Sequence, residues 1–127
     1  MSLPADLAPR IVALLERAPL PLSDEKQLQA DMLALLKADG LDAVREVRLD
    51  QRDIVDFMIF DGDFVLTGLA IEVKIKGQRR AIYRQLERYC AHPRVNGILL
   101  ATNVAMSLPA EIEGKPACVA RLGRAWL

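Results

Sequence analysis

Cysteine is scarce in this chain, whose 127 residues include only Cys90 and Cys118, far apart in the sequence. Neither lies in a Cys-x-x-Cys spacing, so we expect both to be buried and reduced, without a disulfide or a metal. Long apolar runs are missing too: apolar residues make up 52% of the chain, but no run approaches the roughly 20 residues that cross a bilayer. The N-terminus has no basic stretch ahead of an apolar one, so no signal peptide is expected and the predicted compartment is the cytoplasm.

An excess of charge of either sign is also absent, because 17 Lys and Arg residues balance 17 Asp and Glu residues. This balance excludes a globally basic nucleic-acid binder, but it leaves room for a locally basic face. No internal repeat, linker or low-complexity tract divides the sequence. The length therefore fits one domain, residues 1–127, which is long enough to bury a core.

The periodicity of the apolar residues predicts helices and strands in a definite order. Two helices are expected first, one over Ala8–Ala18 with Pro9 in its first turn, and one from an N-cap at Ser23 to about Asp39. A meander of three antiparallel strands, a third helix and two further strands follow. Their predicted ranges are Val44–Leu49, Asp53–Phe60, Phe64–Lys76 with a possible break near Gly68, Gln78–Ala91, Gly97–Thr102 and Ala117–Leu122, with turns at Asp50-Gln51 and Asp61-Gly62-Asp63.

This order predicts an α/β fold, a three-layer α/β sandwich with a mixed sheet. Its core would be αβββαβ, with an extra N-terminal helix and a C-terminal strand. The strand Gly97–Thr102 is expected to lie parallel to an inner strand, because a helical crossover precedes it.

Charged residues alternate with apolar ones along Leu69–Lys76. Successive side chains of a strand point to opposite faces, so Glu72 and Lys74 should point the same way. Asp56 lies in the preceding strand, inside the run Ile54–Phe60. That run is apolar on both faces, so its carboxylate should lie against a core unless something compensates it.

The flanking helices contribute further polar groups. Glu25 falls on the apolar stripe of the second helix, which makes it either a first-turn residue or a group aimed at a site. Gln85 flanks the core stripe of the helix Gln78–Ala91. On the opposite face of that helix, arginines recur every four residues, with one more at its start: Arg79, Arg80, Arg84 and Arg88.

Each of these features has an ordinary explanation when it is taken alone. Alternating charges suit a half-exposed strand, Asp56 could cap a backbone group or pair with a buried arginine, and the arginine row could be the solvated side of a helix. Taken together, two acids and a lysine on adjacent strands, followed by a helix with cations and a glutamine, indicate a metal-dependent nuclease.

Asp56, fifteen intervening residues and Glu72-Val73-Lys74 resemble the core motif of the PD-(D/E)XK nuclease superfamily. The order of elements from Ser23 to Thr102 resembles the minimal fold of that superfamily. Glu25 is similar to the glutamate that some members carry on the first core helix, and Gln85 to the glutamine that many carry after the motif. Val55 precedes Asp56 where many members have proline, which leaves the subfamily open among restriction enzymes, junction resolvases and repair nucleases.

The resemblance implies hydrolysis of DNA phosphodiester bonds with Mg²⁺ or Mn²⁺. Asp56 and Glu72 would be metal ligands, the Val73 carbonyl a third, and Glu25 would complete the shell directly or through water. Lys74 would orient or deprotonate the attacking water or stabilise the developing charge, and Gln85 would fix this lysine or touch the scissile strand. Contacts to backbone phosphates are expected from Lys76, Arg79, Arg80, Arg84 and Arg88.

The expected function is therefore a metal-dependent DNA endonuclease, selective for DNA structure because no further domain is present to read bases. Cutting both strands needs two active sites, so a homodimer is expected, and the apolar tail with Val119, Leu122, Trp126 and Leu127 is one candidate interface. One alternative is a Holliday-junction resolvase, which cleavage of four-way junctions would distinguish. Another is a catalytically silent nuclease-like module that binds nucleic acid or a protein. The intact Asp56, Glu72 and Lys74 argue against the silent module.

Overall fold

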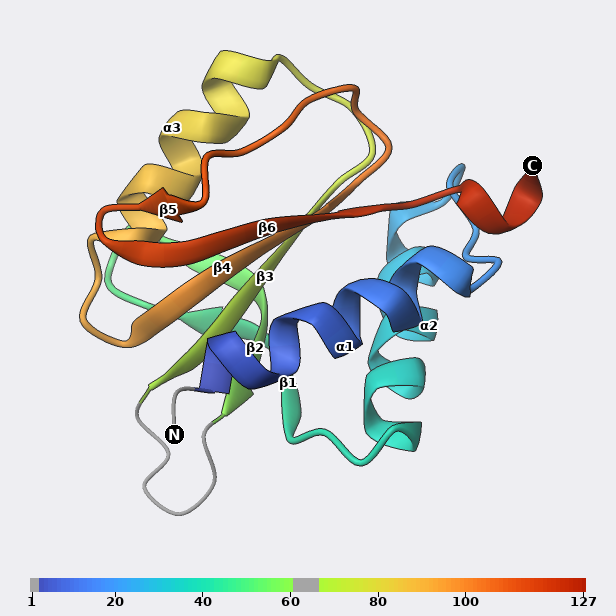
Figure 1. Cartoon of the computed structure of the whole chain (residues 1–127), viewed down its shortest axis with the longest axis horizontal. Coiled ribbons are helices and arrows are strands. Elements are labelled where there is room, and N and C mark those ends of the chain that lie inside the picture. Colours follow the sequence, from blue (N-terminus) through green and yellow to red (C-terminus); the bar gives the residue numbers. More distant parts are fainter. Residues whose placement is uncertain (1–2, 61–66) are drawn as a thin grey trace.

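The structure is a computed structural model that describes residues 3–60 and 67–127. Over these residues the chain forms three α-helices, six strands and one short 3-10 helix (Figure 1). In chain order they are α1 (Leu3–Arg17), α2 (Glu25–Ala38), β1 (Ala43–Arg48), β2 (Ile54–Phe60), β3 (Gly68–Lys74), α3 (Arg79–Cys90), β4 (Val95–Thr102), β5 (Glu111–Ile112), β6 (Lys115–Arg121) and η1 (Arg124–Trp126).

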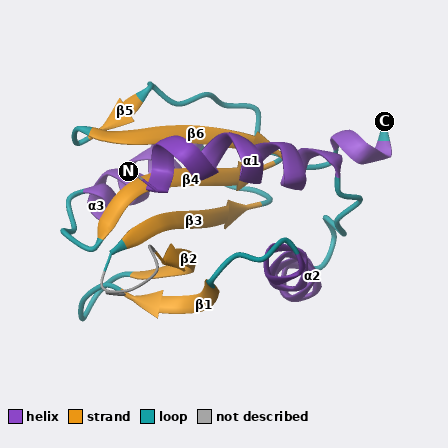
Figure 2. Cartoon of the chain, turned by 60° about the horizontal axis from the view of Figure 1, so that its bottom comes forward, coloured by secondary structure: helices purple, strands orange, loops and turns teal. Residues whose placement is uncertain are grey.

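The strands form one mixed sheet in the order β1-β2-β3-β4-β6-β5. The pairs β1–β2 and β2–β3 are antiparallel, as the predicted meander requires, while β3–β4 and β4–β6 are parallel. The helix α3 connects β3 to β4 and covers one face of the sheet, and α1 and α2 lie on the other side (Figure 2). The predicted α/β sandwich with a mixed sheet is therefore confirmed.

Two apolar clusters fill the spaces between these layers. Ile11, Leu28 and Phe57 belong to the cluster under α1 and α2, whereas Met58 and Leu86 belong to the cluster under α3. The predicted alternation along β3 is confirmed. Leu69, Ile71 and Val73 face α1 and α2, whereas Ala70 faces α3.

The element ends differ from the prediction in several places. α1 begins at Leu3 and not at Ala8, so Pro9 lies inside the helix, where it removes one backbone hydrogen bond. The N-cap of α2 is Asp24 and not Ser23, since the Asp24 side chain accepts the Gln27 N–H at 3.2 Å. β3 ends at Lys74 because its ladder with β4 ends at the pair Lys74↔Thr102. The predicted turn 61–63 and the predicted strand residues 64–66 lie outside the described residues.

The C-terminal segment contains two elements that the sequence pattern did not predict, β5 and η1. Leu122 is buried and therefore cannot contribute to an interface as predicted. The Trp126 indole N–H donates to the Leu20 carbonyl at 2.9 Å, while the residue stays 60% exposed. A homodimer remains a prediction.

Cys90 and Cys118 are both free, although Cys118 is only half-buried, and burial raises the pKa of each thiol to about 11. Among the helices of the described residues, none has both the length and the apolar character to cross a membrane.

Gly68 brings β3 close to β2 at the start of their pairing. A Cβ atom added at this position would lie 2.2 Å from the Ile59 carbonyl oxygen, a backbone atom that a side-chain rotation cannot displace. We expect Gly68→Ala to lower the free energy of unfolding by about 2 kcal/mol or more, as overpacking against backbone does. Denaturant unfolding would measure this, with Thr67→Ala, one residue earlier and outside the strand, as the control. Equal stability of the Gly68 variant and the wild type would contradict it.

Candidate active site

The antiparallel ladder between β2 and β3 stops just before two acidic residues. The ladder runs from Phe60↔Gly68 to Phe57↔Ile71. Continued by one residue, the same register places Asp56 opposite Glu72. Directly opposed residues of an antiparallel pair have neighbouring side chains. The predicted positions of Asp56 and Glu72 on adjacent strands are confirmed.

The two carboxylates take over the backbone groups that the ladder leaves unpaired. Asp56 Oδ2 accepts the Val73 N–H at 2.8 Å, and Glu72 Oε1 accepts the Asp56 N–H at 3.3 Å. Each strand thus holds a carboxylate from the other. These reciprocal bonds fix both side chains at the point where the strands separate.

Asp56 also lies where β2 changes the face that its side chains present. Val55 packs in the cluster under α3, whereas Phe57, two residues later, packs under α1 and α2. The same exchange occurs in β1 at Glu46, which has a φ of 54° and lies opposite Asp56 in the register. The Asp56 carboxylate reaches β3, where the Val73 N–H donates to it. The carboxylate is largely shielded from solvent, as expected of an acid in an apolar run, and this hydrogen bond and the charge of Lys74 compensate it.

Lys74 follows Glu72 on the same side of β3, as the alternation predicted. Its Nζ lies 3.3 Å from Glu72 Oε2. The Lys74 side chain is 26% exposed while Glu72 is 3% exposed, so the ammonium group lies between the buried acid and solvent. The interpretation of Glu72 as part of a solvated face is therefore wrong.

Burial raises the pKa of Glu72 to about 8, and repulsion by Asp56 adds to this shift, while Lys74 opposes it. Burial also raises the pKa of Asp56, against the hydrogen bond from the Val73 N–H and the charge of Lys74. Two carboxyl groups so close together resist being ionised at the same time. The pair carries an unfavourable concentration of negative charge whenever both are deprotonated.

The donor atoms at this point fit a hard divalent cation. Both carboxylates are oxygen donors, and a cation between them would relieve their repulsion. The Val73 N–H points at Asp56, and since the N–H and C=O of a strand residue face the same neighbouring strand, the Val73 carbonyl is directed to the same side. The Val73 carbonyl as a metal ligand stays a prediction.

Glu25 does not complete a three-carboxylate set. Within residues 3–60 and 67–127, no three His, Cys, Asp or Glu side chains are grouped closely enough to hold a metal. Glu25 is exposed in the first turn of α2, yet its charge still contributes to the raised pKa of Asp56, after burial. Whether Glu25 contacts a metal directly or through water stays a prediction.

Gln85 contacts Tyr89 rather than Lys74. Its Nε2 donates to the Tyr89 hydroxyl at 2.7 Å, and that hydroxyl donates to the Ile54 carbonyl at 3.1 Å. Burial raises the pKa of Tyr89 above its usual range, and the charges of Glu72 and Asp56 raise it further. Tyr89 is thus a buried polar neighbour of the acidic pair, and it was not singled out from the sequence. Its hydroxyl on an otherwise apolar stripe was the available signal.

The basic side chains predicted to contact phosphates divide into two groups. Arg88 donates to Asp53 Oδ1 at 3.1 Å, and Asp53 is buried, so this arginine holds the start of β2 against α3. The others are exposed, and no described acid forms an ion pair with them: Lys76, Arg79, Arg80 and Arg84.

Comparison with protein-family models, with curated proteins and with solved structures gives no match to this chain.

Proposed function

We propose that this chain is a metal-dependent DNA endonuclease of the PD-(D/E)XK superfamily, which hydrolyses phosphodiester bonds. One observation carries the proposal: Asp56 and Glu72 lie opposite each other at the end of a strand ladder, with the Lys74 ammonium 3.3 Å from Glu72. Two hard oxygen donors beside a cationic proton donor are the groups that phosphodiester hydrolysis requires.

Asp56, Glu72 and the Val73 carbonyl would hold the Mg²⁺ or Mn²⁺, with Glu25 contributing through water. When bound, the metal lowers the pKa of a coordinated water and neutralises charge on the phosphate. The chain itself keeps these donors in place before DNA arrives, because backbone N–H groups of the opposite strands hold both carboxylates.

Lys74 acts on the water and the phosphate. Its partly exposed ammonium can donate a hydrogen bond to a phosphate oxygen while it stays beside Glu72 Oε2, and it can orient the attacking water. Only in its neutral amine form could Lys74 take the proton of that water. Gln85 acts indirectly, since its bond to Tyr89 supports the beginning of β2 next to Asp56.

The exposed cations supply affinity for DNA without reading its sequence. Arg79, Arg80, Arg84 and Lys76 contact backbone phosphates, while Arg88 has a structural role through Asp53. We therefore propose selectivity for DNA structure, with a Holliday junction as one candidate substrate. A homodimer would supply the two sites that cut both strands, and the proposed compartment is the cytoplasm.

The proposal is tested by incubating the purified protein with linear, flapped and four-way DNA of the same sequence. We expect cleavage in Mg²⁺ or Mn²⁺ and none in EDTA, with branched DNA cut faster than linear duplex. Cleavage that persists in EDTA would contradict the mechanism. DNA binding without cleavage of any substrate would favour a silent binding module.

A further inference from the structure

The C-terminal ends of the three parallel strands lie in line at one edge of the sheet. The register pairs Lys74 of β3 with Thr102 of β4, and Thr102 with Arg121 of β6. Ligands of α/β sheets bind outside this edge of parallel strands. Lys74 belongs to the candidate active site, while Arg121 belongs to a separate hollow two strands away.

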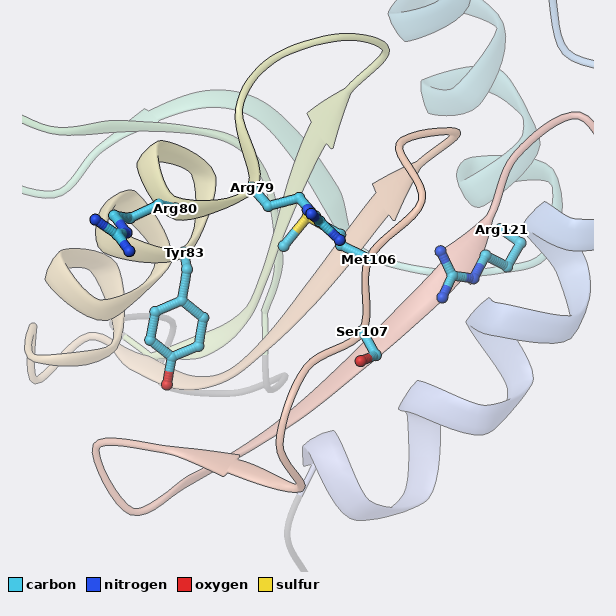
Figure 3. A pocket seen from close by; sticks show the side chains of 6 residues that line it. All are labelled: Arg79, Arg80, Tyr83, Met106, Ser107 and Arg121. Atoms are coloured by element: carbon cyan, nitrogen blue, oxygen red, sulfur yellow. The ribbon is translucent and has the colours of Figure 1, made fainter.

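This hollow has a volume of about 540 Å³, within the range of small-molecule sites. Residues of α3, of the segment after β4 and of β6 line it: Arg79, Arg80, Tyr83, Met106, Ser107 and Arg121. Figure 3 shows the guanidinium groups of Arg79 and Arg121 pointing toward each other from opposite walls, with Ser107 on the segment between them. We call this hollow the arginine cleft.

The charge in the arginine cleft is uncompensated. Three of its six lining residues are arginines and none is an acid. Glu16 accepts the backbone N–H of Arg121, and its side-chain ion pair is with Arg124. Facing guanidinium groups repel each other, so an anion between them would lower the free energy of the cleft.

One arginine is already held in position without using up its donors. Arg121 donates from one terminal nitrogen to the Val104 carbonyl at 3.2 Å. A guanidinium has five N–H donors, so the remaining ones can bind an anion in a forked arrangement. Arg79 has no ion-pair partner among the described residues, and it approaches from the other wall.

We propose that the arginine cleft binds the phosphomonoester of a nucleotide unit. A phosphomonoester carries close to two negative charges and three acceptor oxygens, which suits cations converging from two sides. Ser107 adds a hydroxyl donor, and the ring of Tyr83 offers a surface on which a base can stack. The two sources of this chemistry are the phosphorylated end of a nucleic-acid strand and a free mononucleotide.

A chain of hydrogen bonds through Thr102 and Val104 connects the arginine cleft to the candidate active site. The Thr102 hydroxyl donates to the Lys74 carbonyl and accepts the Val104 N–H, and the Val104 carbonyl accepts Arg121. A strand end in the cleft would thus lie along the same sheet edge as Lys74. The strand end as the source rests on the proposed nuclease function, whereas binding of the phosphomonoester itself does not.

The test measures binding in EDTA, where cleavage plays no part. Short single strands of one sequence would carry a phosphate at the 5′ end, at the 3′ end or at neither end. We expect one of the phosphorylated strands to bind about 10-fold or more tightly than the unmodified strand, as charge-assisted hydrogen bonds to one further group predict. Equal affinity of all three strands would overturn the proposal.

Variants of the lining residues test whether the preference for a phosphorylated strand comes from the arginine cleft. Arg121→Gln and Arg79→Gln should each remove most of the preference for the phosphorylated strand, and Arg79 is exposed, so its loss should leave the fold intact. Arg84→Gln, on α3 but outside the cleft, should weaken all strands similarly and keep the preference. A preference that survives in both cleft variants would also overturn the proposal.

Competition separates the two sources. A deoxynucleoside monophosphate that displaces the phosphorylated strand at a similar concentration would identify the free nucleotide as the ligand. A mononucleotide that displaces it only at much higher concentration would identify the strand end. Either result supports the cleft as a phosphomonoester site, and both can be obtained even if the protein cuts no DNA.

Discussion

Replacing Lys74 by alanine is expected to lower the rate of DNA cleavage by roughly 10²- to 10⁴-fold, the usual contribution of a positioned acid–base group. The ammonium lies 3.3 Å from Glu72 and its side chain is partly exposed, so a water or a phosphate oxygen can accept a hydrogen bond from it. Lysine is not a ligand for a hard cation, so Mg²⁺ and DNA should still bind. Single-turnover cleavage and DNA affinity in Ca²⁺ would measure the two effects separately.

Two comparisons make this result specific to Lys74. Lys37→Ala removes an exposed lysine from the last turn of α2 and should cleave like the wild type. Asp56→Asn should also be inactive. Mg²⁺ should raise the melting temperature of the wild type and of Lys74→Ala, but not that of Asp56→Asn, which lacks a metal ligand. A Lys74→Ala protein that cleaves DNA at the wild-type rate would contradict the proposed role of Lys74 in the mechanism.

Glu72→Gln is expected to stabilise the metal-free protein at alkaline pH. The pKa of Glu72 is raised to about 8 by burial and by Asp56, so its ionised form is disfavoured in the folded state. The contribution of Glu72 to stability should therefore be fully present below the unfolded-state pKa of about 4.5 and should be lost as the pH rises toward about 8. The glutamine keeps an acceptor for the Asp56 N–H without this charge.

The difference between the two proteins should depend strongly on pH. At pH 9 we expect the Gln variant to be more stable by roughly 2–4 kcal/mol, which corresponds to a melting temperature higher by about 10 °C, and at pH 4 the two should nearly coincide. Thermal unfolding in EDTA would measure this, with Glu111→Gln, an exposed acid of β5, as the control. Mg²⁺ should then raise the melting temperature of the wild type and not of Glu72→Gln. A difference that does not vary with pH would contradict the electrostatic explanation.

The sequence allowed the sheet and the acidic pair to be predicted because both depend on local patterns. Alternation along β3 determines that Glu72 and Lys74 share a side and that Ile71 faces α1 and α2. The short turn after Asp50 implies an antiparallel return, which the bonds from the Arg52 and Asp53 N–H groups to Asp50 stabilise. These features need no knowledge of distant residues.

The partners of Arg88 and Gln85 could not be predicted in the same way. Each contact depends on how α3 packs against the start of β2. Arg88 and its partner Asp53, for example, are 35 positions apart in the sequence. A helical wheel gives the face on which a side chain lies, but not the residue that it meets across a tertiary contact. The change of face at Asp56 was likewise not predicted, and it lies opposite Glu46 of a different strand, whose φ is positive.

The contact between α1 and β6 has a consequence for the order in which the chain can fold. α1 packs on β6 and η1 as well as on the central strands, and the bond from the Arg121 N–H to Glu16 joins residues 105 positions apart. α1 is synthesised before β6, yet it cannot bury its apolar side fully until β6 has emerged and joined β4. Long-range closure of this kind slows folding. Ile11 and Leu15 are fully buried in the fold, and we expect them to be solvent-exposed until β6 has joined the sheet. A nascent chain that stops before β6 is therefore a target for chaperones and proteases.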